Sequence, residues 1–390
     1  MSAGIRFFPD KAWMGYMAAL ASCLLLLLAL PPGWISAWTW VSGLRWIYVF
    51  AIAYFLANVL MPFAIFSAPA LGAMDWPDQR KAHSIPTPRT GGLALFAAAA
   101  FAVWRGQFFT HEVNAILAAG AVIFVLGAVE DCKGLSALVR LIGQIAASLI
   151  IVANGMVFNF PGNSAAGNFW SGVLTVVWLV GITNAFNFLD GIDGLVGGLG
   201  LVCSILFMGV AWNTQQFGLA FMCAALAGSC AAFLQFNWHP ARVFLGDSGA
   251  TLIGFLLASF AVYGGWATDN PMVAFATPLL ILGIPVFDMI YITAARIHRG
   301  DVRTLKQWIE FVGRDHLHHR LLHLGFPVPK AVAFVLLLNI ILGMGAWTMH
   351  YTASAVGTLF LLMQSVLLFV LIAALMISGR ELKDGGQNIP

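Results

Sequence analysis

Long apolar runs separated by short polar segments recur along this chain from one end to the other. A helix needs about 20 predominantly apolar residues to cross the hydrocarbon core of a bilayer. The runs cover residues 13–31, 44–66, 92–106, 114–129, 137–157, 169–189, 191–212, 216–237, 248–266, 272–296, 330–349 and 354–377. The pattern therefore predicts an all-α polytopic membrane protein with about 11–12 transmembrane helices.

Composition supports this fold class and narrows the partners. The chain has 390 residues, of which 61% are hydrophobic and 9% charged. We therefore expect a lipid bilayer as a partner, no nucleic acid and no soluble domain of useful size. The first run resembles a signal peptide, but it ends in Pro31-Pro32-Gly33 without a small-residue cleavage site, so we expect it to be retained.

The distribution of Lys and Arg predicts which polar segments share a face of the membrane. With the N-terminus inside, Arg45 and Arg105 are the only basic residues outside, as the positive-inside rule favours. The only acidic residues outside are then Glu112 and Asp269. The concentration of acidic residues in short cytoplasmic loops indicates a functional site on that face. The cytoplasmic segments are 67–91, 130–136, 187–193, 238–247, 297–329 and the C-terminal tail.

The stretch N-A-F-N-F-L-D-G-I-D-G-L carries four polar side chains at a constant spacing of three. They are Asn184, Asn187, Asp190 and Asp193. Two carboxylates and two carboxamides at the end of a membrane helix are costly unless something binds them. A divalent cation with a phosphorylated substrate would do so. The alternative is a polar helix cap before a Gly-rich turn, but capping needs one such residue and not four.

Further carboxylates lie at two other predicted helix ends. Glu130 and Asp131 directly follow the run 114–129, where adjacent negative charges repel each other and oppose the helix dipole. They suit a general base or a metal site. Asp247, in F-L-G-D-S-G, opens the next helix and either caps it or ligates a metal. Phe244 is a candidate for stacking on a base or for anchoring at the membrane interface.

Two basic segments are candidates for binding phosphate. Arg80, Lys81 and His83 precede the stiff ending P-T-P-R-T-G-G, and Arg offers a bidentate fork to phosphate oxygens. The alternative is an ordinary loop attracted to anionic lipid. The second segment lies within 297–329 and is rich in His, an inefficient choice for solubility alone. Its candidate residues, with one from the preceding helix, are Arg296, Arg314, His316, His318 and His319.

Together these motifs resemble the polyprenyl-phosphate N-acetylhexosamine-1-phosphate transferases of glycosyltransferase family 4. They occur in the family's order, from R-K-x-H-x-x-P-T-P-R-x-G-G to H-L-H-H, and the last form resembles the bacterial undecaprenyl-phosphate N-acetylglucosamine-1-phosphate transferase branch. The chain differs from the family in having Glu130 where Asp is usual and in one additional N-terminal span. The resemblance implies a single membrane domain over 1–390, with the additional span in 1–43, a catalytic core over 67–329 and C-terminal spans with a tail over 330–390.

The resemblance also implies a reaction: UDP-HexNAc, most often UDP-GlcNAc, and undecaprenyl phosphate give undecaprenyl-pyrophosphoryl-HexNAc and UMP. It initiates a cell-envelope polysaccharide such as O-antigen, common antigen or teichoic acid. The implied setting is a bacterial inner membrane with the active site facing the cytoplasm.

By motif, Asp247 and Asn187 would hold Mg²⁺, with Mn²⁺ as a possible substitute, and Asp190 would support that metal shell. Asp131 would orient or deprotonate the lipid phosphate, with Glu130 beside it and His316 as a further catalytic residue. The remaining candidates would bind nucleotide, sugar or phosphate: Asp193, Phe244, Asn184, Arg80, Lys81, His83, Arg296, Arg314, His318 and His319.

Several alternatives stay open from the sequence. The sugar is GlcNAc by default, with QuiNAc, FucNAc or GalNAc as substitutes, and a homodimer is one oligomeric state. A secondary transporter would place its acids near span midpoints and in two matching halves, whereas these acids cluster at one face. A family member serving as a scaffold would have little use for the intact Asp/Asn set.

Overall fold

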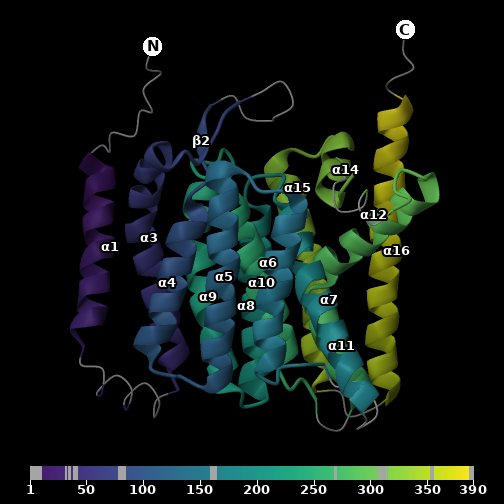
Figure 1. Cartoon of the computed structure of the whole chain (residues 1–390), viewed down its shortest axis with the longest axis horizontal. Coiled ribbons are helices and arrows are strands. Elements are labelled where there is room, and N and C mark those ends of the chain that lie inside the picture. Colours follow the sequence, from purple (N-terminus) through teal and green to yellow (C-terminus); the bar gives the residue numbers. More distant parts are fainter. Residues whose placement is uncertain are drawn as a thin grey trace.

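The computed structural model describes residues 11–30, 33, 37, 43–77, 85–158, 165–267, 270–304, 307, 313, 315–351 and 355–385. Helices dominate these residues (Figure 1). In chain order they are α1 (Lys11–Ala29), α3 (Arg45–Leu71), α4 (Gly91–Gly106), α5 (His111–Lys133), α6 (Ala137–Ala153), α7 (Ala165–Leu189), α8 (Leu195–Asn213), α9 (Phe217–Asn237), α10 (Gly246–Tyr263), α11 (Pro271–Ile281), α12 (Gly283–Arg299), α14 (Leu317–His323), α15 (Val328–Met349) and α16 (Ala355–Gly385).

The helices confirm the predicted class of an all-α polytopic membrane protein. Within the described part of the chain, eight helices are long and apolar enough to cross a bilayer, and the bent pair α11–α12 makes a ninth. Three shorter apolar helices, α1, α4 and α6, coincide with the remaining predicted runs. The runs 169–189 and 191–212, nearly continuous in sequence, are separated by a turn between Leu189 and Leu195.

The core of the bundle lies around α9 and α10, which are buried over most of their length. Helix α16 is mostly exposed and runs along one edge, and α1 runs along the opposite edge (Figure 1). Both described ends of the chain, the strand β2 (Thr87–Pro88) and helix α14 lie at one end of the bundle (Figure 1). The polar segments between helices therefore gather on one face, as the sequence predicts.

A short antiparallel ribbon holds the base of the loop after α3. It pairs β1 (Met74–Asp75) with β2 (Thr87–Pro88). Arg89 continues it, because its N–H donates to the Ala73 carbonyl and its guanidinium pairs with Asp75. The ribbon ends directly before α4 and so fixes where that helix begins.

The run 272–296 was predicted as one span, but it is broken into α11 and α12 with a bend of 81°. Pro285 explains the break, because proline has no N–H to donate to the Ile281 carbonyl one turn earlier. That carbonyl is instead approached by Asn339 Nδ2 at 3.2 Å and by Cys203 Sγ at 3.2 Å. Neighbouring helices thus satisfy the freed backbone group, as is required inside a membrane.

We predict that Asn339→Leu destabilises the bundle by about 0.6–1.7 kcal/mol, the size of intramembrane side-chain hydrogen bonds. Unfolding of the purified protein in mixed detergent micelles would measure it. Thr348→Val is the control on the same helix, because that hydroxyl bonds the Met344 carbonyl of its own helix and is exposed. Equal stability of Asn339→Leu and wild type would contradict this account of the break.

Candidate active site

The site is built where α5 and α7 end and α10 begins. Asp131, in the last turn of α5, accepts hydrogen bonds from the first N–H groups of α10. Its Oδ1 is 2.8 Å from the Asp247 nitrogen and its Oδ2 is 3.0 Å from the Ser248 nitrogen. The first N–H groups of a helix have no partner within the helix. Asp131 therefore caps α10 from a different helix and is itself buried.

Gly246 allows this close approach. Its φ is +70°, and a Cβ there would collide with the Arg89 carbonyl oxygen and with both carboxylate oxygens of Asp131. The segment before α10 also binds the segment between β2 and α4. The Phe244 N–H donates to the Pro88 carbonyl, and the Phe244 carbonyl accepts from the Gly91 N–H. The predicted site residue Phe244 thus joins the start of α10 to the base of the basic loop.

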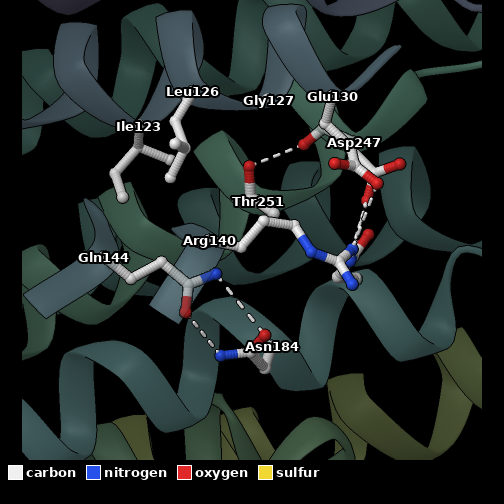
Figure 2. Close-up of a pocket in the computed structure, with 10 residues that line it drawn as sticks. Ile123, Leu126, Gly127, Glu130, Arg140, Gln144, Asn184, Asp247 and Thr251 are labelled. Atoms are coloured by element: carbon white, nitrogen blue, oxygen red, sulfur yellow. Dashed lines mark hydrogen bonds and ion pairs between the residues drawn. The ribbon is translucent and has the colours of Figure 1, made fainter. Parts of the chain in front are cut away.

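A pocket opens beside Asp247 between α5, α6, α7 and α10 (Figure 2). Asp247 Oδ1 accepts a hydrogen bond from Asn187 Nδ2 at 3.0 Å and lies 3.7 Å from Arg140 Nη1. The same guanidinium nitrogen is 3.6 Å from Glu130 Oε1. One wall of the pocket is apolar, formed by Ile123 and Leu126.

Asn184 lines the same pocket and pairs with Gln144 of α6 (Figure 2). Asn184 Nδ2 donates to Gln144 Oε1 at 2.7 Å, and Gln144 Nε2 donates to Asn184 Oδ1 at 3.4 Å. Asn184 Nδ2 also donates to the Val180 carbonyl. These hydrogen bonds between the two side-chain amides join α6 to α7 and add polar groups to the lining of the pocket.

The two aspartates after α7 have different environments. Asp190 lies in the turn directly after α7. The surrounding protein, followed by the charges of Asp247 and Asp131, raises its pKa, which Arg89 opposes. A bound cation would favour the ionised form of Asp190.

Asp193 instead holds the segment before α10. Its Oδ2 accepts from the Ala241 N–H at 3.1 Å and is 2.7 Å from His239 Nδ1. Both partners lie between α9 and α10, so Asp193 joins the turn after α7 to the α9–α10 connection. Its predicted contact with a base stays a prediction.

The predicted His and Arg residues form a buried cluster between α12 and α14. His316, His318 and Arg296 have at most 4% of their surface exposed, and His319 is half-buried. Among the described residues, neither ring nitrogen of His318 has a hydrogen-bond partner. Burial, followed by the charges of His319 and His316, lowers the pKa of His318 well below its usual value, so that ring is neutral.

The cluster contacts the Asn/Asp stretch through aromatic packing. The ring of His316 stacks on Phe188 with centroids 5.6 Å apart, and His318 lies so close to Gly191 that a Cβ there would meet its ring. The four predicted residues Arg80, Lys81, His83 and Arg314 lie outside the described residues.

The residues around Asp247 suit a magnesium ion by their chemistry. Mg²⁺ is held in proteins by one or two carboxylates with water and substrate phosphates, and not by a cage of protein ligands alone. Asp247, Asp190 and the carboxamide of Asn187 supply oxygen donors of this kind. Among the described residues no three or more His, Cys, Asp or Glu side chains form a group that could hold a metal ion by themselves.

Comparison with known proteins identifies the family. Residues 113–265 match the sequence profile of glycosyl transferase family 4. The chain is 30% identical, over 78% of its length and 84% of the relative's, to a probable undecaprenyl-phosphate N-acetylglucosaminyl 1-phosphate transferase of Bacillus subtilis (strain 168). This chain belongs to glycosyl transferase family 4.

Other members of the family have related descriptions. A decaprenyl-phosphate N-acetylglucosaminephosphotransferase of Mycobacterium tuberculosis is 32% identical over 72% of this chain and 76% of the relative. The undecaprenyl-phosphate alpha-N-acetylglucosaminyl 1-phosphate transferase of Escherichia coli K12 is 28% identical over 73% of this chain and 79% of the relative. These descriptions agree with the branch that the H-L-H-H motif indicates.

The structure adds residues that were not predicted as part of the site. Arg140 and Gln144, both on α6, line the pocket of this family 4 transferase. The sequence feature that could have indicated them is the short connection Gly134–Ser136, because it places the start of α6 beside the end of α5. Ser136 accepts from the Val139 N–H as the N-cap of α6, so the first turn of α6, and Arg140 with it, faces Glu130.

We predict that Gly246→Ala lowers transferase activity about 100-fold, the effect of a displacement of about 1 Å at a reacting centre. The added methyl would push Asp131 and Arg89 away from the start of α10. Initial rates of the purified variants would measure it.

The matched control is Gly134→Ala. Gly134 also has a positive φ, +71°, but no atom of the described part of the chain lies within 4 Å of a Cβ at that position. An equal loss in both variants would attribute the effect to backbone strain and not to displacement of Asp131.

Proposed function

We propose that this chain transfers GlcNAc-1-phosphate from UDP-GlcNAc to undecaprenyl phosphate and releases UMP. The observation that carries the proposal is that Asp247 is the meeting point of three helices at the membrane face where the polar segments gather: its side chain accepts from Asn187 in the pocket, and its backbone N–H donates to Asp131. The relatives' descriptions, which name polyprenyl phosphates and N-acetylglucosamine phosphate transfer, support it.

The position of the pocket suits substrates from two phases. A polyprenyl phosphate places its phosphate at the membrane interface and its chain in the bilayer, whereas a nucleotide sugar arrives from water. The pocket has a charged rim with Asp247 and Arg140 and an apolar wall with Ile123 and Leu126. The positive-inside distribution of Arg and Lys favours the cytoplasm for this face, in a bacterial inner membrane.

In the proposed reaction an oxygen of the lipid phosphate attacks the β-phosphorus of UDP-GlcNAc. The bond from that phosphorus to the bridging oxygen breaks, and UMP leaves with the electron pair. A phosphate monoester is already a nucleophile, which favours direct attack over an enzyme-bound intermediate. The work left to the protein is alignment and neutralisation of charge, as in other phosphoryl transfers.

Three groups in and beside the pocket divide this work. Arg140 offers a guanidinium fork that matches phosphate oxygens, at the rim between Glu130 and Asp247. Asn187 and Asp247 would hold Mg²⁺, which would neutralise the pyrophosphate. Asp131 fixes the start of α10 and so positions Asp247, and its contact with the lipid phosphate stays a prediction.

The reaction predicts UMP release from UDP-GlcNAc that depends on undecaprenyl phosphate. The purified protein would be incubated with the lipid and a panel of UDP-sugars, including UDP-QuiNAc, UDP-FucNAc and UDP-GalNAc, with UMP and the lipid product both measured. Release with UDP-GlcNAc supports the proposal. UMP release with only another UDP-sugar would replace the sugar, and no lipid-linked product with any of them would refute the transferase.

The metal assignment predicts that a chelator stops turnover and that added Mg²⁺ restores it. Asp247→Asn keeps the shape of the side chain but removes its charge, so we expect it to lose both turnover and the binding of Mn²⁺, followed by electron paramagnetic resonance. Asp301→Asn, an exposed carboxylate on a different loop, is the control. Unchanged Mn²⁺ binding in Asp247→Asn would exclude Asp247 as a ligand.

A further inference from the structure

Asp288 is a buried carboxylate on α12 that the candidate site does not use. It is 2% exposed, and each of its oxygens has one partner at the start of α14. Oδ2 is 2.6 Å from His316 Nδ1, and Oδ1 accepts from the Leu317 N–H at 2.8 Å. The break between α11 and α12 directs α12 towards this place, so the carboxylate depends on the broken span for its position.

The contacts of His316 define which ring nitrogen carries the proton. A carboxylate only accepts hydrogen bonds, so Nδ1 donates to Asp288. The opposite nitrogen, Nε2, is 3.4 Å from Arg296 Nη2. Because a guanidinium only donates, this contact is favourable when Nε2 keeps its lone pair. Asp288 therefore favours the tautomer that accepts a hydrogen bond from Arg296.

Arg296 is also held in place by Asp315. Its Nε and Nη2 bind both oxygens of Asp315, at 3.1 and 2.6 Å, and Arg299 contributes a further bond to Asp315 at 3.1 Å. Burial alone would raise the pKa of Asp315, but the hydrogen bond and charge of Arg296, with a further hydrogen bond from Arg299, hold it at about 2. This part of the network thus stays ionised at neutral pH.

The network reaches the candidate site through the ring of His316. That ring stacks on Phe188, which lies next to Asn187 at the end of α7. His318, two residues later, presses on Gly191. The start of α14 therefore supports the end of α7, which carries Asn187, and the turn after it, which carries Asp190.

We propose that Asp288 is a positioning residue, which orients His316 so that its ring supports the end of α7 and holds Asn187, with Asp190 in the turn after it, in register with Asp247. This inference rests on the proposed transferase function. Asp288 touches no substrate and acts through His316.

The substitution Asp288→Asn tests this with no change of shape. An amide has one acceptor oxygen for two donors, so its NH₂ group faces either the Leu317 N–H or His316 Nδ1. In the second case the imidazole must take the tautomer whose Nε2–H faces Arg296. We expect kcat to fall about 10–100-fold, the range for partners that orient a functional imidazole, with KM for UDP-GlcNAc changed less.

Asp301→Asn is the matched control, because Asp301 is an exposed carboxylate just after the end of α12, where it pairs with Arg299. Wild type and this control establish the reaction, so their inactivity would count against the proposed function and not against Asp288. The melting temperature of each purified variant separates loss of positioning from unfolding. A kcat of Asp288→Asn close to that of the control would overturn the proposal.

His316→Asn tests the same link from its other end. Its amide can still donate to Asp288, but the acceptor for Arg296 and the ring on Phe188 are lost. If Asp288 acts through His316, the double variant Asp288→Asn/His316→Asn is no slower than His316→Asn alone. Losses that multiply, or a His316→Asn variant as fast as wild type, would show that Asp288 does not act through His316.

Discussion

The capping of α10 by Asp131 is the interaction on which the rest of the site depends. A carboxylate from the end of α5 satisfies two N–H groups at the start of α10, and its negative charge also suits the positive end of the helix dipole. This contact brings Asp247 to the end of α7, where Asn187 reaches it. Without it, two buried N–H groups and a buried carboxylate would each lack a partner, at a cost of about 1–3 kcal/mol per group and more for the charge.

At several interruptions of the helices, a polar group is satisfied by a segment distant in sequence. Asn339 and Cys203 approach the carbonyl freed by Pro285. Asp288 accepts from the start of α14, and Asp193 accepts from the segment before α10. Each polar contact joins two segments distant in sequence, so the same bonds that satisfy buried groups also position the site.

Much of the site could be predicted from the sequence because oxygen-rich side chains are conspicuous in so apolar a chain. Asn187, Asp190 and Asp247 stand out at helix ends, where they are costly without a ligand. Arg140 and Gln144 do not, because a basic residue and an amide near a helix start are typical of any membrane interface. The break at Pro285 was missed because the apolar run is continuous and single prolines are tolerated in membrane helices. The burial of His316 and His318 depends on how α14 packs, which no local pattern reports.

The long sequence separation of the capping contact has a consequence for biosynthesis. Asp131 and its partner Ser248 are 117 residues apart, so during insertion from the N-terminus α5 enters the membrane well before α10 has been made. Until α10 arrives, the acidic end of α5 has to remain at the aqueous surface, where water can solvate it. The pair of carboxylates at that end thus also opposes premature slippage of α5 into the bilayer, and the pocket comes into existence only when most of the chain has been translated.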